Sequence, residues 1–430
     1  MSAETDGDRG GSRGRAEFSR DVVWNVGALA LAGGLGILLN YLVGAVHGAA
    51  ALGVFNQVFA IYILFSQLAA LGFHYSVLTH AAAAVDDAER RTVITSALLV
   101  TGAIALVMAV VMWLAAAPLG RLLDSDDVAV GVVCVAPGIW FFALSKVTLA
   151  CLNALARMRW YAVLFAGRFV VMVLAFAACA ALDVDSAFLP IILTVAEAVT
   201  FVVSLIPARR HIGRVALAAL RRWGRAHLRF GLKGFSSGVL AELNTRVDVL
   251  LLGFFSTDAV VGAYSFAAIL AEGLLQLLVV LRTNYAPILI RLWSERRTEE
   301  LAGTARRVRN RVYLASLGAG ALAIALYAGG IGWVTSDPHL LESWKYFAVL
   351  CAGMVAASGY VPLQPLLLYA GMPGWHTWLV AGIVGLNALA NALLIPPLGA
   401  LGSALGTAAA LVLGVVLFRA MAARLLGLRL

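Results

Sequence analysis

Long apolar runs separated by short polar segments make up most of the chain. A helix needs about 20 apolar residues to cross the hydrocarbon core of a bilayer. Six such runs lie in the first half, at about 22–44, 50–72, 93–115, 129–151, 160–182 and 186–207. Six more follow, at about 235–256, 259–281, 311–333, 346–369, 375–396 and 400–422. Because lipid cannot satisfy backbone polar groups, the pattern predicts an all-α polytopic membrane protein with about twelve transmembrane helices.

Composition supports this fold class. Of the 430 residues, 62% are hydrophobic and only 13% are charged, and the mean hydropathy is +0.91. A soluble protein would have to expose much of that apolar surface and would aggregate. The four cysteines lie inside apolar stretches without CxxC spacing, so we expect no disulfide framework, no metal site and no cofactor.

Basic and acidic residues lie in different sets of loops. Most of the 32 Lys and Arg residues lie in the N-terminal tail, in every second loop and in the C-terminal tail. The opposite loops are acidic and contain Asp124, Asp126, Asp127, Asp183, Asp185, Asp258, Asp337 and Glu342. By the positive-inside rule both termini are cytoplasmic, and we expect a multi-pass protein of a bacterial inner (plasma) membrane. The net charge of +9 is then a topology signal, and no nucleic-acid partner is expected.

The chain divides into five predicted parts. They are a disordered cytoplasmic tail (1–20), an N-terminal six-helix half (21–208), a basic amphipathic cytoplasmic linker (209–233), a C-terminal six-helix half (234–424) and a short cytoplasmic tail (425–430). In the linker, Ile212–Arg229 has apolar residues at helical spacing with Arg, His and Trp interleaved, as in a helix lying on the inner leaflet. The alternative is an ordinary connection between the halves.

The two halves share sequence features. Four residue pairs are separated by 209 positions: Gly44 and Gly253, Gly53 and Gly262, Phe55 and Tyr264, and Gln67 and Gln276. LNALARMRW and LLLYAGMPGW match at an offset of 214. Since each half has an even helix count, the pattern predicts two parallel six-helix halves, an N-lobe and a C-lobe. They would be related by an axis along the membrane normal, around a central cavity.

Several ionisable residues fall inside the predicted spans, where a charge is costly and therefore a candidate for function. They are Lys146, Arg168, Glu197, Glu242, Arg246, Asp248 and Glu272. Helical rise places the pair Arg168 and Glu197 at one depth, and Arg246 and Glu272 at a similar one. Each pair would lie on neighbouring antiparallel helices. The alternative is that these groups form ion pairs that only fix helix packing.

The end of the chain carries further polar features. Pro362 and Pro365 predict a kink in the tenth helix, because each removes a backbone donor. Asn387 and Asn391 lie four residues apart before a Pro-Pro turn. We interpret this last hairpin as structural.

Two segments resemble a known family. TRVDVLLLGFFSTDAVVGAYSFAAIL and NALANALLIPPLGALGSALGTA resemble signatures of the Wzx-type polysaccharide flippases of the multidrug/oligosaccharidyl-lipid/polysaccharide (MOP) exporter superfamily. The first helix pair, from WNVGALALAGG onward, resembles the same family. The resemblance implies a non-enzymatic transporter that flips undecaprenyl-linked oligosaccharide units from the inner to the outer leaflet, for lipopolysaccharide or exopolysaccharide export. Polysaccharide polymerase and glycosyltransferases would be its partners, beside membrane lipid.

The resemblance and the charges together assign roles. Arg246, Lys146 and Arg168 would bind the anionic head group. Asp248, Glu272, Glu197 and Glu242 would carry coupling H⁺ or Na⁺. Peptidoglycan-precursor flippases of the superfamily typically have fourteen helices, which argues against lipid II as the substrate.

Two other functions stay open. A multidrug-type cation antiporter of the same superfamily would favour an acidic cavity, whereas basic and acidic groups are balanced here. A membrane-embedded polymerase or acyltransferase would need a sizeable outer loop or a His/Asp constellation, and the seven histidines are scattered.

Overall fold

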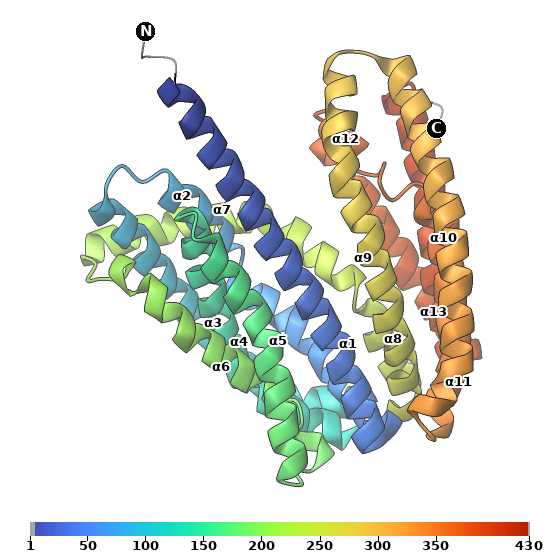
Figure 1. The fold of residues 1–430 in the computed structure, drawn as a ribbon. Helices are drawn as coiled ribbons and strands as arrows, with labels where there is room; N and C mark the ends of the chain where they lie inside the picture. Colours follow the sequence, from blue (N-terminus) through green and yellow to red (C-terminus); the bar gives the residue numbers. More distant parts are fainter. Residues whose placement is uncertain (1–4, 429–430) are drawn as a thin grey trace. The chain divides into compact units, whose positions relative to one another are not determined.

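The protein is built from α-helices throughout the described part of the chain (Figure 1). The structure is a computed structural model; it describes residues 5–428, and the side chains of residues 24–232, 242 and 245–428. The helices are α1 (Thr5–Ala70), α2 (Phe73–Ala82), α3 (Asp87–Leu122), α4 (Asp126–Ala154), α5 (Met158–Ala181), α6 (Ile191–Ala208), α7 (Leu217–Asn244), α8 (Val247–Phe255), α9 (Asp258–Ser294), α10 (Thr298–Val334), α11 (Pro338–Ser358), α12 (Leu366–Tyr369) and α13 (Pro373–Leu425), with short 3₁₀ turns at Ser186–Phe188 and Arg209–His211.

Two of these helices are hairpins rather than rods. In α1 the Asn56 side chain donates to the Asn40 side chain over 2.9 Å, although sixteen residues of straight helix would span about 24 Å. The reversal lies at Gly48, whose φ of 82° and ψ of −179° are non-helical. Gly399 has the same role in α13, where Ser403 donates to Asn391 over 2.9 Å. Each hairpin therefore supplies two of the predicted spans.

The seventh predicted span, at about 235–256, is broken. α7 ends at Asn244 and α8 begins at Val247, with Arg246 between them at φ −135° and ψ −8°. Nine helices of the described residues are long and apolar enough to cross a membrane. Two of them are the hairpins, and α7–α8 adds a discontinuous crossing. The fold is thus the predicted polytopic bundle of twelve crossings.

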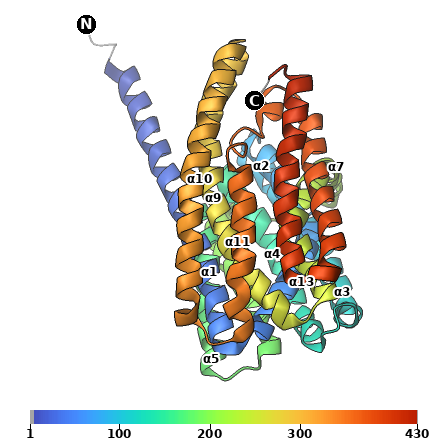
Figure 2. The same ribbon diagram turned by 90° about the vertical axis from the view of Figure 1, so that its right-hand side faces the viewer.

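The chain separates into two compact units. The first comprises residues 1–39, 62–117 and 130–236, and the second comprises 40–61, 118–129 and 237–430. The units differ from the predicted six-helix halves, because the segments around the Gly48 reversal and the α3–α4 turn join the second unit. Within the second unit α11 packs against α9, α10 and α13 (Figure 2).

The helix ends after α4 and after α12 have the same hydrogen-bond pattern. After α4, the amides of Ala156 and Arg157 donate to the carbonyls of Asn153 and Leu152, and Ala156 has a positive φ of 55°. After α12, Gly371 has a φ of 77°, and its amide and the next donate to Leu368 and Leu367 in the same way. These are Schellman caps. They align the two segments at an offset of 215, one residue more than the sequence match predicts.

The tenth predicted span is interrupted rather than kinked. α11 ends at Ser358, and residues 359–365, which include Pro362 and Pro365, form turns before the short α12. Two prolines three residues apart remove two donors from one helical turn, so the helix cannot continue through them.

The N-terminal segment and the linker also differ from expectation. The backbone of residues 5–20, predicted to be a disordered tail, continues α1, and residues 1–4, 429 and 430 lie outside the described part. The amphipathic helix predicted over 212–229 is present, but it begins at Leu217 and continues as α7 into the seventh crossing.

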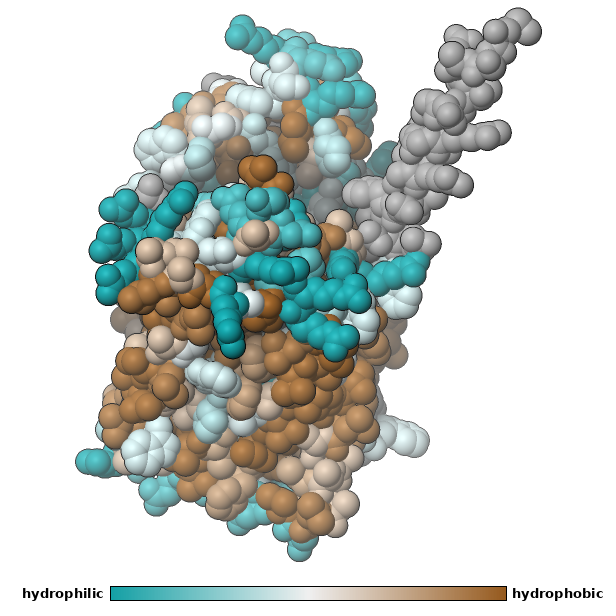
Figure 3. Space-filling model, turned by 90° about the vertical axis from the view of Figure 1, so that its left-hand side faces the viewer, coloured by the Kyte–Doolittle hydropathy of each residue, from teal (hydrophilic) through white to brown (hydrophobic). Residues whose placement is uncertain are grey.

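The surface carries the pattern expected of a membrane protein. On the face shown in Figure 3, hydrophilic side chains gather toward one end and apolar side chains cover the region next to them. Many large apolar side chains are exposed, such as Leu174 (63%) and Leu326 (66%). Such a surface is stable only against lipid.

Candidate functional site

Arg246 lies at the break between α7 and α8, in the second unit. Its guanidinium is 3.5 Å from a carboxylate oxygen of Glu272 on α9, and the two side chains are 20% and 35% exposed. The guanidinium also lies over the ring of Phe59, 5.2 Å from its centre. A pair at this distance and exposure is weak. The positive charge of Arg246 is therefore held in place by an aromatic ring but is available to another anion.

Asp248 lies two residues later and is almost fully buried. One carboxylate oxygen accepts a hydrogen bond from the Tyr264 hydroxyl at 2.5 Å, and the other accepts from the backbone amide of Val249 at 2.9 Å. The Tyr264 hydroxyl also interacts with the side chains of Ser403 and Thr407 on α13. Hydroxyl groups and a backbone amide therefore surround the carboxylate, and none of the ion pairs among the described residues includes it.

Amide groups of α13 extend this cluster. Asn391 donates to the Asn387 side chain at 2.7 Å and accepts from Ser403 at 2.9 Å. The Thr407 hydroxyl donates to Asn387 over 3.4 Å. Since Asn387 and Asn391 are 3% and 0% exposed, a buried oxygen-rich network, here called the Asp248 network, joins α8, α9 and both arms of the α13 hairpin.

A second cluster lies in the first unit. Arg168 on α5 is 3.2 Å from Glu197 on α6, and the same Glu197 oxygen accepts from the Tyr62 hydroxyl at 2.9 Å. Glu197 is 1% exposed, while Arg168 is 20% exposed and packs on the rings of Phe165 and Phe169. The other Glu197 oxygen is buried with no hydrogen-bond partner among the described residues. A buried carboxylate oxygen without a donor is the atom where a proton or a cation costs least.

The two remaining candidates are placed differently. Lys146 on α4 lies 5.1 Å from the ring centre of Phe142, which in turn packs edge-on against Tyr62 of the Arg168 cluster. Glu242 is half-buried near the end of α7. No side-chain hydrogen bond or ion pair of Glu242 exists among the residues whose side chains are described. The structure thus brings Lys146 to the Arg168 cluster, and none of the described side-chain interactions connects Glu242 to either cluster.

Acidic residues at helix starts connect distant segments of the second unit. Asp258, the first residue of α9, accepts from the Gln57 side chain at 2.6 Å and from the Ser125 hydroxyl at 2.7 Å. Asp337, which caps α11, accepts from the backbone amide of Ala49 at 2.9 Å. We call these contacts the acidic seam, because they join the predicted acidic loops to the Gly48 reversal and the α3–α4 turn.

Comparison of the sequence with known protein families identifies one match. The sequence model of one protein family, described as "Polysaccharide biosynthesis protein", matches residues 18–293, which is more than half of the chain. The chain belongs to this family. No curated protein sequence matches it closely enough to count as a relative.

Solved structures agree at the level of the fold. The lipid II flippase MurJ aligns with a TM-score of 0.75 over 92% of this chain and 86% of its own, at 13% identity. A multidrug resistance MATE family transporter of the MOP superfamily aligns with a TM-score of 0.70 over 89% and 91%, at 13% identity. A MOP superfamily transporter from Pyrococcus furiosus gives 0.53 over 93% of both chains, again at 13% identity. This member of the polysaccharide biosynthesis family is therefore a multi-pass membrane protein whose fold is that of MurJ and the MATE transporters.

Sequence reasoning missed the partners of Asp248. Tyr264, Asn387 and Asn391 stand in the quoted family signatures, but the two asparagines were interpreted as structural. Asn387 and Asn391 reach the Asp248 carboxylate only indirectly, through Ser403, Thr407 and Tyr264, and this link depends on the α13 hairpin, which the sequence pattern alone does not relate to α8.

Proposed function

We propose that this transporter flips an oligosaccharide linked to a polyprenyl pyrophosphate from the inner to the outer leaflet by alternating access. The observation that carries the proposal is the loose Arg246–Glu272 pair. Its 3.5 Å separation and partial exposure let a pyrophosphate replace the carboxylate, since phosphate oxygens accept two guanidinium hydrogen bonds at once. Arg168 and Lys146, in the other unit, would bind further anionic groups of the head.

Coupling to H⁺ or Na⁺ would run through the carboxylates. The Asp248 network supports this, because it offers carboxylate, hydroxyl and amide oxygens, the ligand types that hard cations prefer. Glu197, with its unpartnered oxygen, is the corresponding candidate in the first unit, and Glu272 and Glu242 remain secondary candidates.

Orientation follows the positive-inside rule. With both termini cytoplasmic, the acidic seam would lie at the outer side of the second unit. Glycosyltransferases that build the lipid-linked unit would work on the cytoplasmic side, and a polymerase would receive it outside. The inner membrane of a bacterium is the location that this order of events requires.

The experiment is translocation of a fluorescent polyprenyl-pyrophosphate oligosaccharide in proteoliposomes. Arg246→Ala should reduce the rate at least tenfold, Arg246→Lys less, and Arg306→Ala, an exposed cytoplasmic charge, should leave it unchanged. Normal translocation by Arg246→Ala at equal protein insertion would remove Arg246 from the mechanism. If the wild-type protein instead expels cationic dyes and moves no lipid-linked sugar, it is a multidrug-type antiporter.

A further inference from the structure

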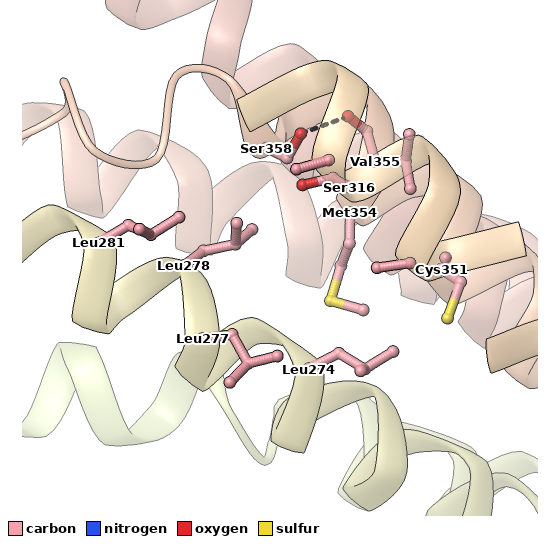
Figure 4. A pocket seen from close by; sticks show the side chains of 12 residues that line it. Leu274, Leu277, Leu278, Leu281, Ser316, Cys351, Met354, Val355 and Ser358 are labelled. Atoms are coloured by element: carbon pink, nitrogen blue, oxygen red, sulfur yellow. Dashed lines mark hydrogen bonds between the residues drawn. The ribbon is translucent and has the colours of Figure 1, made fainter. Parts of the chain in front are cut away.

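An apolar pocket opens between α9, α10 and α11 in the second unit. Its volume is about 160 Å³. Leu274 and Leu278 of α9 line one side, Met354 and Ser358 of α11 line the other, and small residues of α10 such as Ala319 complete it (Figure 4). A cavity of this size holds an apolar molecule as large as benzene and stays dry.

Exposed apolar side chains surround the pocket. Leu277 lines it and is 61% exposed, and Leu314 and Leu317, which flank the α10 wall, are 75% and 59% exposed. Because these helices cross the membrane, the medium that reaches the pocket is hydrocarbon rather than water. A lipid chain is the molecule that this position offers.

Two arginines meet on one tyrosine ring beside the pocket. Arg309 of α10 donates to the Tyr360 hydroxyl at 3.3 Å, and the guanidinium groups of Arg309 and Arg419 each lie 5.8 Å from the centre of that ring. Among the ion pairs of the described residues, neither arginine has a carboxylate partner. Two uncompensated positive charges around one ring attract an anion.

The arginines and the pocket are continuous. Ser358 of the pocket wall is followed by Gly359, where a Cβ atom would lie 2.8 Å from the Arg309 side chain. Along α10, Arg309 is six residues from the pocket-lining Ala315, which corresponds to about 9 Å. Arg309 and the pocket wall are thus less than two helical turns apart on α10, so that one lipid molecule can reach both.

We propose that the pocket and the two arginines bind an anionic glycerophospholipid. Its phosphate would lie between Arg309 and Arg419, and a segment of one acyl chain would fill the pocket. Arginine pairs with phosphate through two parallel hydrogen bonds, and both arginines belong to the basic end of the helices, where head groups of the anionic leaflet gather. The site lies within one unit and is separate from Arg246, so it does not depend on the proposed substrate.

The size of the pocket selects this occupant. About 160 Å³ accommodates a short segment of a straight chain, whereas a polyprenyl chain carries a methyl branch on every fourth carbon and needs a wider groove. Bulk phospholipid also surrounds the protein at high concentration, so modest affinity is enough to occupy the site.

The test uses the full-length protein, purified and returned to lipid of defined composition. Lipid retained after delipidation is measured by native mass spectrometry, and the melting temperature is followed as phosphatidylglycerol or phosphatidylcholine is added. Wild type should retain phosphatidylglycerol at least tenfold better than phosphatidylcholine. The double variant Arg309→Gln/Arg419→Gln should lose this preference, while Arg306→Gln/Arg307→Gln, with the same loss of charge on α10, should keep it.

The pocket is tested separately. Ala319→Leu fills it and should lower phosphatidylglycerol retention about tenfold, whereas Ala325→Leu on the same helix, outside the pocket, should not. If the double arginine variant fails to fold, the Ala319→Leu comparison decides. Three results would each overturn the proposal: equal retention of both lipids, full stabilisation by free glycerol phosphate, or displacement of the phospholipid by an equal amount of polyprenyl phosphate.

Discussion

Gly53 of α1 packs against the backbone of α9, and Gly262 of α9 packs against the backbone of α1, within the second unit. A Cβ atom on Gly53 would lie 1.8 Å from the carbonyl oxygen of Asp258, and one on Gly262 would lie 1.9 Å from that of Ala49. Ala49 and Asp258, like the two glycines, are separated by 209 residues. The same backbone contact therefore occurs twice, related by the internal repeat, and at both places a side chain is excluded.

Replacing either glycine should open this contact. Gly53→Ala and Gly262→Ala each force two helices apart at the acidic seam, and we expect each to lower the unfolding free energy by about 2 kcal/mol, a typical cost of overpacking. Since the contacts are equivalent, the two losses should be similar. Thermal unfolding in detergent measures them.

Gly33→Ala is the matched control, because a Cβ atom there meets nothing within 4 Å. Its melting temperature should equal or exceed that of wild type, since alanine is the better helix former. A Gly53→Ala protein as stable as the Gly33→Ala protein would show that the helices do not approach so closely.

Much of the fold could be predicted from the sequence, because span length and loop charge are local properties. The runs, the repeat of Gly53 and Gly262 and the amphipathic linker all correspond to real elements. The break at Arg246 was not predicted, since the run 235–256 is apolar on both sides of it. The Gly48 reversal moves residues 40–61 into the second unit, and such long-range pairing leaves no periodic signal.

The candidate site also has parts that could be predicted from the sequence and parts that could not. Helical depth correctly paired Arg168 with Glu197 and Arg246 with Glu272, because depth follows from residue count. Residue count says nothing about rotation or about distant helices. It therefore could not relate Asp248 to the Asn391 network.

Asp337 should contribute to stability through backbone amides. Its carboxylate caps α11 and accepts from Ala49, His339 and Leu340. Burial raises the pKa of Asp337, but these amide hydrogen bonds outweigh burial and lower the pKa overall. Asp337→Ala should cost about 1 kcal/mol, the usual value of an N-cap, measured by thermal unfolding at pH 7.

The same pKa gives the direction of a pH effect. A depressed carboxyl pKa means that the stabilisation is present above the ordinary pKa and is lost as the pH falls below it. The difference in melting temperature between wild type and Asp337→Ala should therefore shrink below about pH 4. Asp337→Asn, which retains a side-chain oxygen acceptor, should lie between the two, and a difference that stays constant down to pH 3 would contradict the charged cap.

His227 should make the docking of α7 depend on pH. Its ring bonds to the Ser76 hydroxyl at 2.8 Å and to the carbonyl oxygen of Val93 at 3.1 Å, and it is fully buried against Trp223. Burial lowers the pKa of His227 and nearby His80 adds to the decrease, whereas the Val93 hydrogen bond opposes it; the resulting pKa is about 4.

The sign follows from this depressed pKa. Between about pH 6.5 and 4 the undocked imidazole binds a proton and the docked one does not, so docking weakens as the pH falls. At pH 5 the loss is about 2 kcal/mol, or roughly a thirtyfold larger undocked population. Hydrogen exchange of residues 217–232 at pH 7.5 and pH 5, corrected for intrinsic rates, measures it. His227→Gln should flatten the dependence and exposed His339→Gln should keep it; an unchanged slope in His227→Gln would assign it to another group.

Asp248 and Tyr264 should separate ion coupling from substrate binding. Asp248→Asn removes the charge but keeps the acceptor for the Tyr264 hydroxyl, so the protein should fold and bind lipid-linked substrate while transport no longer responds to an H⁺ or Na⁺ gradient. Tyr264→Phe removes one hydrogen bond and should lower ion affinity by about tenfold. Transport by Asp248→Asn that still responds to both gradients would move coupling to Glu197 or Glu272.

Arg168 and Glu197 offer a test of function against packing. Arg168→Met alone leaves the Glu197 carboxylate buried without its ion partner, which should cost about 3–5 kcal/mol. The double variant Arg168→Met/Glu197→Leu removes both charges. Its stability should return to near the wild-type value, because no buried charge is then left without a partner. If Arg168 binds the anionic head group, this stable double variant should still lose at least tenfold in translocation. A double variant that folds and translocates normally would make the pair a packing device and leave Arg246 as the principal basic group of the site.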